Sequence, residues 1–187
     1  SRVQKLQMQT QEGNNVSVSG IVGNFDDAQT GVKTIFSDSD FAKELSEGGV
    51  FLSSANSINW GRLVPQIVYY FSAYCNLLKN DEIELGEPIN FVVPTGNFGN
   101  ILAGYYAKKM GLPIDKLICA SNSNNVLTEF FLSGTYDMNR EFFKTISPSM
   151  DILVSSNLER LLYLALDCDA EKTAAYMKSL DETGEYT

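Results

Sequence analysis

The sequence of 187 residues contains no histidine and only three cysteines, Cys75, Cys119 and Cys168. Without histidine the usual general base is missing, so serine–histidine and cysteine–histidine mechanisms are excluded for this chain alone. Three scattered cysteines do not form a disulfide framework, and they leave almost no ligands for zinc. We therefore predict no metal site, and we interpret Cys75 and Cys119 as buried free thiols.

Long apolar runs and positive charge are also scarce. No apolar stretch is long enough to span a bilayer, and no basic-then-apolar leader is present. The sequence has 14 Lys and Arg residues and 23 Asp and Glu residues, which gives a net charge of −9. This charge disfavours nucleic acid and anionic membranes as partners. A site for an anion must therefore rest on backbone amides and a few locally placed cations.

The segment Pro94–Asn100 lies between a predicted strand and a predicted helix. The apolar run Ile89–Val93 is typical of a buried strand, and the spacing over Ile101–Met110 indicates a helix. Gly96 and Gly99 allow a ligand to approach the backbone and allow positive φ. The helix start adds unpaired N–H groups and the positive end of a dipole. This arrangement suits an anion, most often phosphate, but a plain tight turn fits these features equally well.

The same segment lacks two well-known nucleotide motifs. It has neither the Gly-Lys-Ser/Thr ending of a P-loop nor the three-glycine dinucleotide fingerprint. Both absences argue against ATP, GTP and NAD as ligands.

Strand and helix patterns alternate along most of the chain. We predict further strands at 16–22, 50–52 and 116–120, with helices at 3–11, 26–36, 38–45, about 60–79, 126–131, 158–166 and 170–180. Alternation favours an α/β fold with a parallel, twisted sheet flanked by helices in three layers. Because ligands in such sheets bind beyond the carboxyl ends of the strands, we expect the polar turns at 53–59, 95–100 and 121–125 to converge on one rim.

Two motifs in a fixed order resemble a known family. Ser54–Asn59, followed by Arg62, and Pro94–Asn100 closely resemble bacterial threonine synthases, enzymes of the tryptophan-synthase-β (fold-type II) group that use pyridoxal 5'-phosphate. Gly23–Gln29 and Leu112-Pro113 match in order and spacing. The resemblance runs from about residue 3 to at least 125, and more loosely through 151–154. It implies a single domain fragment over 1–187, cut at both ends, with a helical segment at about 151–187.

The resemblance also implies which residues form the site. The phosphate of the cofactor would be held by Thr95, Gly96, Asn97, Phe98, Gly99 and Asn100. We interpret the Phe98 side chain as a packing anchor. The substrate cavity would be lined by Asn56, Ser57, Asn59 and Arg62. Helix capping by Ser57 or Asn56, and an exposed salt bridge for Arg62, remain open alternatives.

The implied reaction converts O-phosphohomoserine and water to threonine and phosphate. The family's Schiff-base lysine lies ahead of anything in this chain, and we interpret Lys144 as a surface lysine. No catalytic residue is therefore assigned here, and we expect the chain alone to be inactive. Its partners would be the small-molecule substrate and the remaining N- and C-terminal parts of the same cytoplasmic protein. The alternatives are a related lyase, such as a serine or threonine dehydratase, and a non-catalytic phosphate-binding domain.

Overall fold

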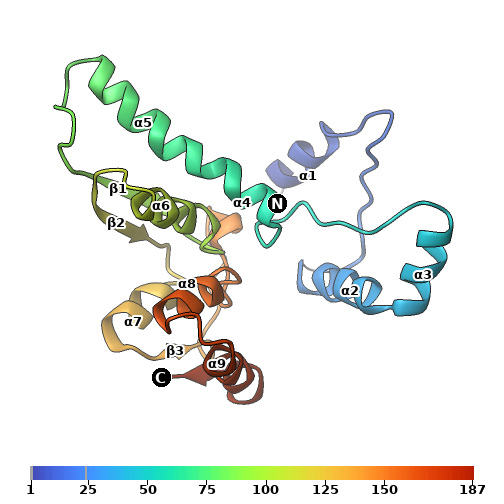
Figure 1. Ribbon diagram of the computed structural model, residues 1–187. Coiled ribbons are helices and arrows are strands. Elements are labelled where there is room, and N and C mark those ends of the chain that lie inside the picture. Colours follow the sequence, from blue (N-terminus) through green and yellow to red (C-terminus); the bar gives the residue numbers. More distant parts are fainter. Residues whose placement is uncertain (1, 24) are drawn as a thin grey trace. The chain divides into compact units, whose positions relative to one another are not determined.

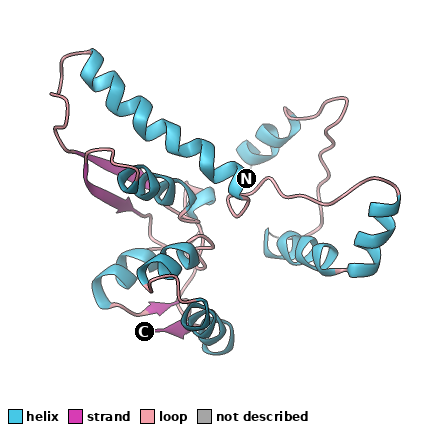
Figure 2. Ribbon diagram, viewed as in Figure 1, coloured by secondary structure: helices cyan, strands magenta, loops and turns pink. Residues whose placement is uncertain are grey.

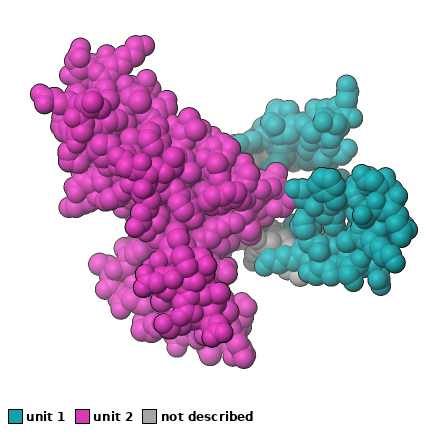
Figure 3. Space-filling view, viewed as in Figure 1, with its two compact units in different colours: residues 1–53 teal, residues 54–187 magenta. Residues whose placement is uncertain are grey.

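The computed structural model describes residues 2–23 and 25–187, and its contacts divide the chain into two compact units. Unit 1 comprises Ser1–Ser53 and unit 2 comprises Ser54–Thr187 (Figure 3). That both units belong to one domain of a longer protein stays a prediction.

The described residues of unit 1 form the helices α1 (Arg2–Gln9), α2 (Phe25–Ser37) and α3 (Ser39–Glu47). Asp38 caps α3, because its carboxylate accepts a hydrogen bond from the Phe41 N–H at 2.9 Å. The sequence offers Ser37 or Asp38 as the cap of this helix, and the structure shows that it is Asp38. The motif at 23–29 includes residue 24, which lies outside the described residues.

The strands predicted in unit 1, at 16–22 and 50–52, do not form. An isolated bridge joins Gly13 and Val16, while Val22 and Phe51 are exposed. A strand pattern becomes a strand only where a neighbour accepts its ladder of hydrogen bonds. The described part of unit 1 supplies no such neighbour, so the alternating pattern was insufficient.

Unit 2 follows the predicted order of elements closely (Figures 1 and 2). In chain order its elements are α4 (Trp60–Leu63), η1 (Val64–Gln66), α5 (Ile67–Lys79), β1 (Ile89–Pro94), α6 (Gly99–Lys109), β2 (Ile114–Ala120), α7 (Val126–Ser133), β3 (Tyr136–Asp137), η2 (Pro148–Met150), α8 (Leu158–Ala165), α9 (Ala170–Thr183) and β4 (Glu185–Tyr186). The helix predicted over about 60–79 is divided, since a 3-10 turn that contains Pro65 separates α4 from α5.

Strands β1 and β2 pair in parallel, with Val93 opposite Cys119 and Pro94 opposite Ala120. Helix α6 makes the crossover between them. The predicted α/β fold with a parallel sheet is therefore confirmed, although the sheet has two strands within the described residues instead of the four expected. Both carboxyl ends lie at the same edge, where the loop 95–98 begins.

The core of unit 2 lies where α6 meets α5 and β2. A Cβ on Gly104 would lie 2.6 Å from the Tyr70 ring and 2.9 Å from Leu117, so glycine allows this close packing. Tyr70 and Tyr74 are buried in this core. Cys75 is exposed, which corrects our interpretation, because it is rotated by about 100° from Tyr74 around α5. Cys119 is a half-buried free thiol.

The end of the chain has a closing element that the sequence pattern did not predict. Helices α8 and α9 are as expected, but β4 then pairs antiparallel with β3. The rings of Tyr136 and Tyr186 stack at 5.3 Å with an interplanar angle of 9°. A two-residue strand is too short to show a periodicity, so the pattern could not reveal it.

Candidate functional site

The loop between β1 and α6 is tied to the sheet at its first residue. Thr95 is buried, and its N–H donates to the Ala120 carbonyl at 2.8 Å. Its hydroxyl donates to the Val93 carbonyl at 2.7 Å. The first bond continues the sheet by one residue and the second fixes the Thr95 side chain, so the loop starts from a rigid edge.

Phe98 carries the left-handed turn that leads into α6. Its φ is 61° and its ψ is 4°, a conformation that costs a non-glycine residue roughly 1–2 kcal/mol. Its side chain is buried and its ring lies 6.1 Å from that of Phe131. Packing therefore offsets the strain, in agreement with the interpretation of Phe98 as an anchor. Our expectation that the glycines would supply positive φ here is wrong.

Gly96 and Gly99 are instead required by close contacts. A Cβ on Gly96 would lie 3.2 Å from the Ser149 carbonyl oxygen and 3.3 Å from the Met150 sulfur. A Cβ on Gly99 would lie 3.0 Å from the Ser57 Cβ. The two glycines thus let the loop lie against two other segments of unit 2.

The N–H groups at the start of α6 are available to a ligand. Those of residues 97–101 donate to no carbonyl or side chain in the part of the chain that the structure describes. They stand at the positive end of an eleven-residue helix. A group with several negatively charged oxygens would satisfy these donors without a basic side chain.

The two asparagine side chains of the loop differ in their surroundings. The Asn100 amide donates to Gln66 Oε1 at 2.9 Å, and the Tyr70 hydroxyl lies 2.8 Å from the Asn100 carbonyl oxygen and 2.9 Å from Oδ1. Burial raises the pKa of Tyr70 to about 12, so this hydroxyl keeps its proton. The side chain of Asn100 is therefore occupied by Tyr70 and Gln66, whereas its backbone N–H remains available to a ligand. Asn97 is exposed, and its Oδ1 accepts from Ser156 Oγ at 3.4 Å.

The turn 54–59 is held together by its own polar groups. Asn56 Oδ1 accepts from the Ile58 N–H at 3.1 Å. Asn59 caps α4 by accepting from the Gly61 N–H at 2.9 Å, so the cap is neither Ser57 nor Asn56. The turn is therefore a preformed unit.

Arg62 forms part of the same unit. One nitrogen of its guanidinium donates to the carbonyl of Ala55. The ion pairs found among the described residues involve Lys172 and Lys178, so the salt-bridge alternative for Arg62 finds no support there. Its remaining N–H groups face no described acceptor, and the residue is exposed.

Two of the three predicted turns are joined by a residue that the sequence reasoning missed. Asn157 is fully buried, and its Nδ2 donates to Ser57 Oγ at 3.2 Å and to the Asn97 carbonyl at 2.9 Å. The polar run Ser155–Asn157 directly before a predicted helix was the available signal, but alone it indicates only a helix start.

The third turn, at 121–125, is organised around Asp151. This carboxylate accepts from Asn122 at 2.7 Å and from the Thr145 N–H at 2.8 Å. Burial raises the pKa of Asp151, but the hydrogen bonds from Thr145, Asn122 and Asn124 together outweigh it and lower that pKa. Met150, the residue before Asp151, lies 3.3 Å through its sulfur from where a Gly96 Cβ would be. The segment that holds the third turn therefore also lies against the loop.

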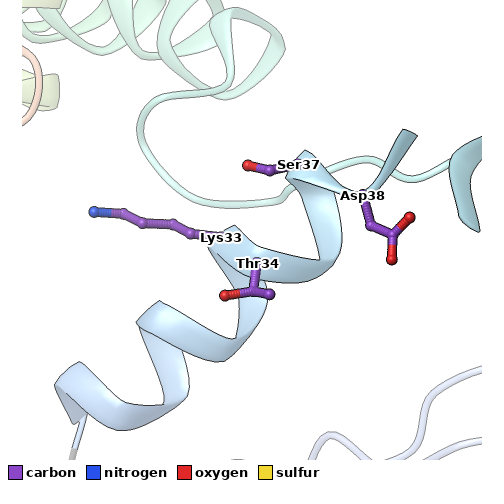
Figure 4. A pocket seen from close by; sticks show the side chains of 4 residues that line it. All are labelled: Lys33, Thr34, Ser37 and Asp38. Atoms are coloured by element: carbon purple, nitrogen blue, oxygen red, sulfur yellow. The ribbon is translucent and has the colours of Figure 1, made fainter. Parts of the chain in front are cut away.

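Cavities of about 520 Å³ lie in each unit, and the one in unit 2 borders the turn 54–59 at Ile58. One, in unit 2, is lined by Trp60, Tyr106, Arg160 and Tyr163 among others. The other lies on unit 1, where the side chains of Lys33 and Asp38 point in different directions (Figure 4). Within 2–23 and 25–187, no cluster of three His, Cys, Asp or Glu residues could hold a metal ion. None of the helices described there has the length and apolarity needed to cross a membrane.

Known proteins similar to this chain are threonine synthases and their relatives. The human protein "Threonine synthase-like 1" is 53% identical over 91% of this chain, which spans 23% of that protein. Threonine synthase of Saccharomyces cerevisiae is 46% identical over 88% of this chain, which spans 31% of that enzyme. No protein-family model matches the chain.

Solved structures show the same likeness. Threonine synthase of Brucella melitensis, solved with bound pyridoxal phosphate, superposes on the whole chain with a TM-score of 0.85 at 48% identity, and the chain covers 38% of it. The yeast enzyme gives a TM-score of 0.82 at 40% identity. The parallel strand–loop–helix–strand unit is thus part of an α/β protein with the fold-type II architecture expected from the sequence. The chain belongs to the threonine synthase family, of whose members it spans about a quarter to a third.

Proposed function

We propose that the protein to which this segment belongs is a threonine synthase, which converts O-phospho-L-homoserine and water to L-threonine and phosphate with pyridoxal 5'-phosphate as cofactor. The proposal is supported by the family relationship and by the cofactor bound in the Brucella enzyme. The observation that carries it is the set of unpaired N–H groups at residues 97–101, which suits a dianionic phosphate.

The loop residues fit the phosphate of the cofactor by their chemistry. Thr95 anchors the loop to the sheet, Phe98 turns the chain into α6, and Gly96 and Gly99 let it approach its neighbours. The backbone N–H groups from Asn97 to Asn100 then hold the phosphate. The cofactor supplies an electron sink for negative charge on the substrate carbons.

The substrate groups would be oriented by the turn 54–59 and the residue that follows it. Asn56 and Asn59 use their side chains to keep the turn rigid. Ser57 can still donate its hydroxyl proton, and Arg62 has free N–H groups suited to bidentate contact with a carboxylate or phosphate. We therefore assign direct substrate contact to Ser57 and Arg62 and a supporting role to the two asparagines.

The proton-transferring lysine is supplied, in this proposal, by another part of the same protein. Lys144 is exposed, in agreement with its interpretation as a surface lysine. The partners are the substrate and the rest of the polypeptide. A cytoplasmic location stays a prediction.

An assay of the full-length protein with competing substrates tests the proposed reaction. We expect O-phosphohomoserine to release phosphate and yield threonine, with serine and threonine turned over at least roughly a hundredfold more slowly, since a site with polar groups for a substrate phosphate discriminates against compounds that lack it. Conversion of serine or threonine to a 2-oxo acid as the main activity would instead identify a dehydratase. Inactivity towards all three compounds would favour a non-catalytic phosphate-binding domain.

A further inference from the structure

The loop 95–100 is backed by a segment that no sequence motif of the site includes. This backing segment, residues 149–157, passes behind the loop at two glycine-dependent contacts. At the first, the Ser149 carbonyl oxygen lies 3.2 Å from where a Gly96 Cβ would be. At the second, Asn157 Nδ2 lies 3.5 Å from the corresponding position of Gly99. The loop therefore has one face covered by the chain itself.

Two buried polar residues of the backing segment bind carbonyl groups of the loop. Ser155 Oγ donates to the Gly96 carbonyl at 2.7 Å. Asn157 donates twice to the Asn97 carbonyl, from its N–H at 3.1 Å and from Nδ2 at 2.9 Å. Ser155 is 5% exposed and Asn157 is fully buried, so both donors are shielded from water.

Peptide geometry links these carbonyls to the N–H groups on the opposite face. In a trans peptide the C=O of one residue and the N–H of the next lie in one plane and point in opposite directions. The described chain contains no cis peptide bond. Holding the Gly96 carbonyl towards Ser155 therefore turns the Asn97 N–H away from the backing segment. Holding the Asn97 carbonyl towards Asn157 does the same for the Phe98 N–H.

We propose that Ser155 and Asn157 are positioning residues that act as a carbonyl clamp. They draw the carbonyls of Gly96 and Asn97 to the rear of the loop. The N–H groups of Asn97 and Phe98 then face an anionic group without a carbonyl oxygen nearby to repel it. The inference rests on the proposed function, because it takes the anion to be the phosphate of the cofactor.

The clamp is itself fixed from both sides. The Ser155 N–H donates to the hydroxyl of the buried Tyr136 at 2.9 Å, and that hydroxyl donates to the Leu153 carbonyl at 2.8 Å. Asn157 Oδ1 accepts from the guanidinium of Arg160, which also donates to the Ile58 carbonyl. Groups held this firmly can impose an orientation on the loop instead of following it.

The clamp also connects the loop with the substrate turn. The amide that binds the Asn97 carbonyl binds Ser57 Oγ as well. One side chain thus sets the spacing between Ser57, which is proposed to contact the substrate, and the peptide plane whose Phe98 N–H is proposed to bind the phosphate. Loss of the Asn157 side chain should consequently disturb both Ser57 and the Asn97 carbonyl, whereas loss of the Ser155 hydroxyl should disturb the loop alone.

The test uses the full-length protein and two ligands that differ only in the phosphate, pyridoxal 5'-phosphate and pyridoxal. Dissociation constants are measured by equilibrium dialysis, and the Tm of each apo-protein shows whether the variant has folded. For Ser155→Ala we expect affinity for the phosphorylated ligand to fall about ten- to a hundredfold, as for a lost buried hydrogen bond, with less than about a threefold change for pyridoxal. Asn157→Leu should give the same selective loss and in addition raise the KM for substrate.

Two further variants make the outcome decisive. Ser155→Cys keeps a weak donor at nearly the same size and should recover part of the selective loss. Thr173→Val removes another buried hydroxyl, on α9, which donates to the Asp169 carbonyl at 2.8 Å. This variant should leave the affinities for both ligands unchanged. If Asn157→Leu does not fold, the Ser155 series alone carries the test.

Equal losses for both ligands, or no loss for Ser155→Ala, would overturn the clamp. Failure of the proposed phosphate site has a different signature, because wild-type protein would then bind the two ligands equally well. A wild-type preference for the phosphorylated ligand combined with an unaffected Ser155→Ala variant would refute the clamp and leave the phosphate site standing.

Discussion

Replacement of Gly96 and Gly99 together by valine in the full-length protein is expected to weaken the binding of pyridoxal 5'-phosphate roughly 10²–10⁴-fold, because overpacking costs about 1–3 kcal/mol at each site. A side chain at Gly96 would meet the Ser149 carbonyl and Met150, and one at Gly99 would meet Ser57. The loop must then move away from these neighbours, and its N–H groups no longer point towards the phosphate. The dissociation constant of the cofactor measures the effect directly.

The control for this variant is a second pair of glycines. Gly20 and Gly31 have nothing within 4 Å of an added Cβ, so Gly20→Val with Gly31→Val should leave cofactor affinity within about threefold of wild type. Circular dichroism and Tm show whether each variant has folded. An unchanged affinity in the folded Gly96 and Gly99 variant would refute the assignment of the loop.

The chain of residues 1–187, expressed alone, is expected to show no turnover of O-phosphohomoserine. An amine must carry protons between substrate carbons in the proposed reaction, and we place that lysine outside this chain. We expect pyridoxal 5'-phosphate to bind weakly at most, through its phosphate, without the absorbance band of a specific lysine adduct.

Titration of the isolated chain followed by absorbance measures both parts of this expectation. The full-length protein, titrated in parallel, should develop the band at one equivalent of cofactor. Lys144 provides a matched control because it is exposed. Its replacement by alanine should change neither the cofactor binding nor the absorbance of the isolated chain or of the full-length protein. A strong single-site adduct in the isolated chain, lost on mutating one lysine, would contradict our account of where the nucleophile lies.

The parts of the fold that the sequence predicted are those in which local pattern and tertiary contacts agree. The run Ile89–Val93 pairs with 116–120, and the helix after the loop ends before Gly111, as the spacing indicated. The alternating run 16–22 shows the opposite case. Its pattern suits a strand, but a strand also needs a partner, and no local signal reports whether the described residues supply one.

The sequence directed attention to the loop 95–100 but did not reveal its geometry, and the ligand contacts of its residues stay a prediction. Glycine spacing drew attention to the loop, yet Phe98 adopts the left-handed conformation while the glycines serve close packing. Ser155 and Asn157 lie about 60 residues further along the chain from the carbonyls they bind. Contacts at that separation leave no trace in local periodicity, so only the folded structure reveals them.

The central claim is that main-chain N–H groups at the start of α6 bind the cofactor phosphate. A crystal structure of the full-length protein with pyridoxal 5'-phosphate tests it most directly. We predict phosphate oxygens within about 3.2 Å of backbone nitrogens of residues 97–100, with the Gly96 and Asn97 carbonyls still directed towards Ser155 and Asn157. A phosphate bound at any other place in the protein, with these nitrogens in contact with water alone, would contradict the account.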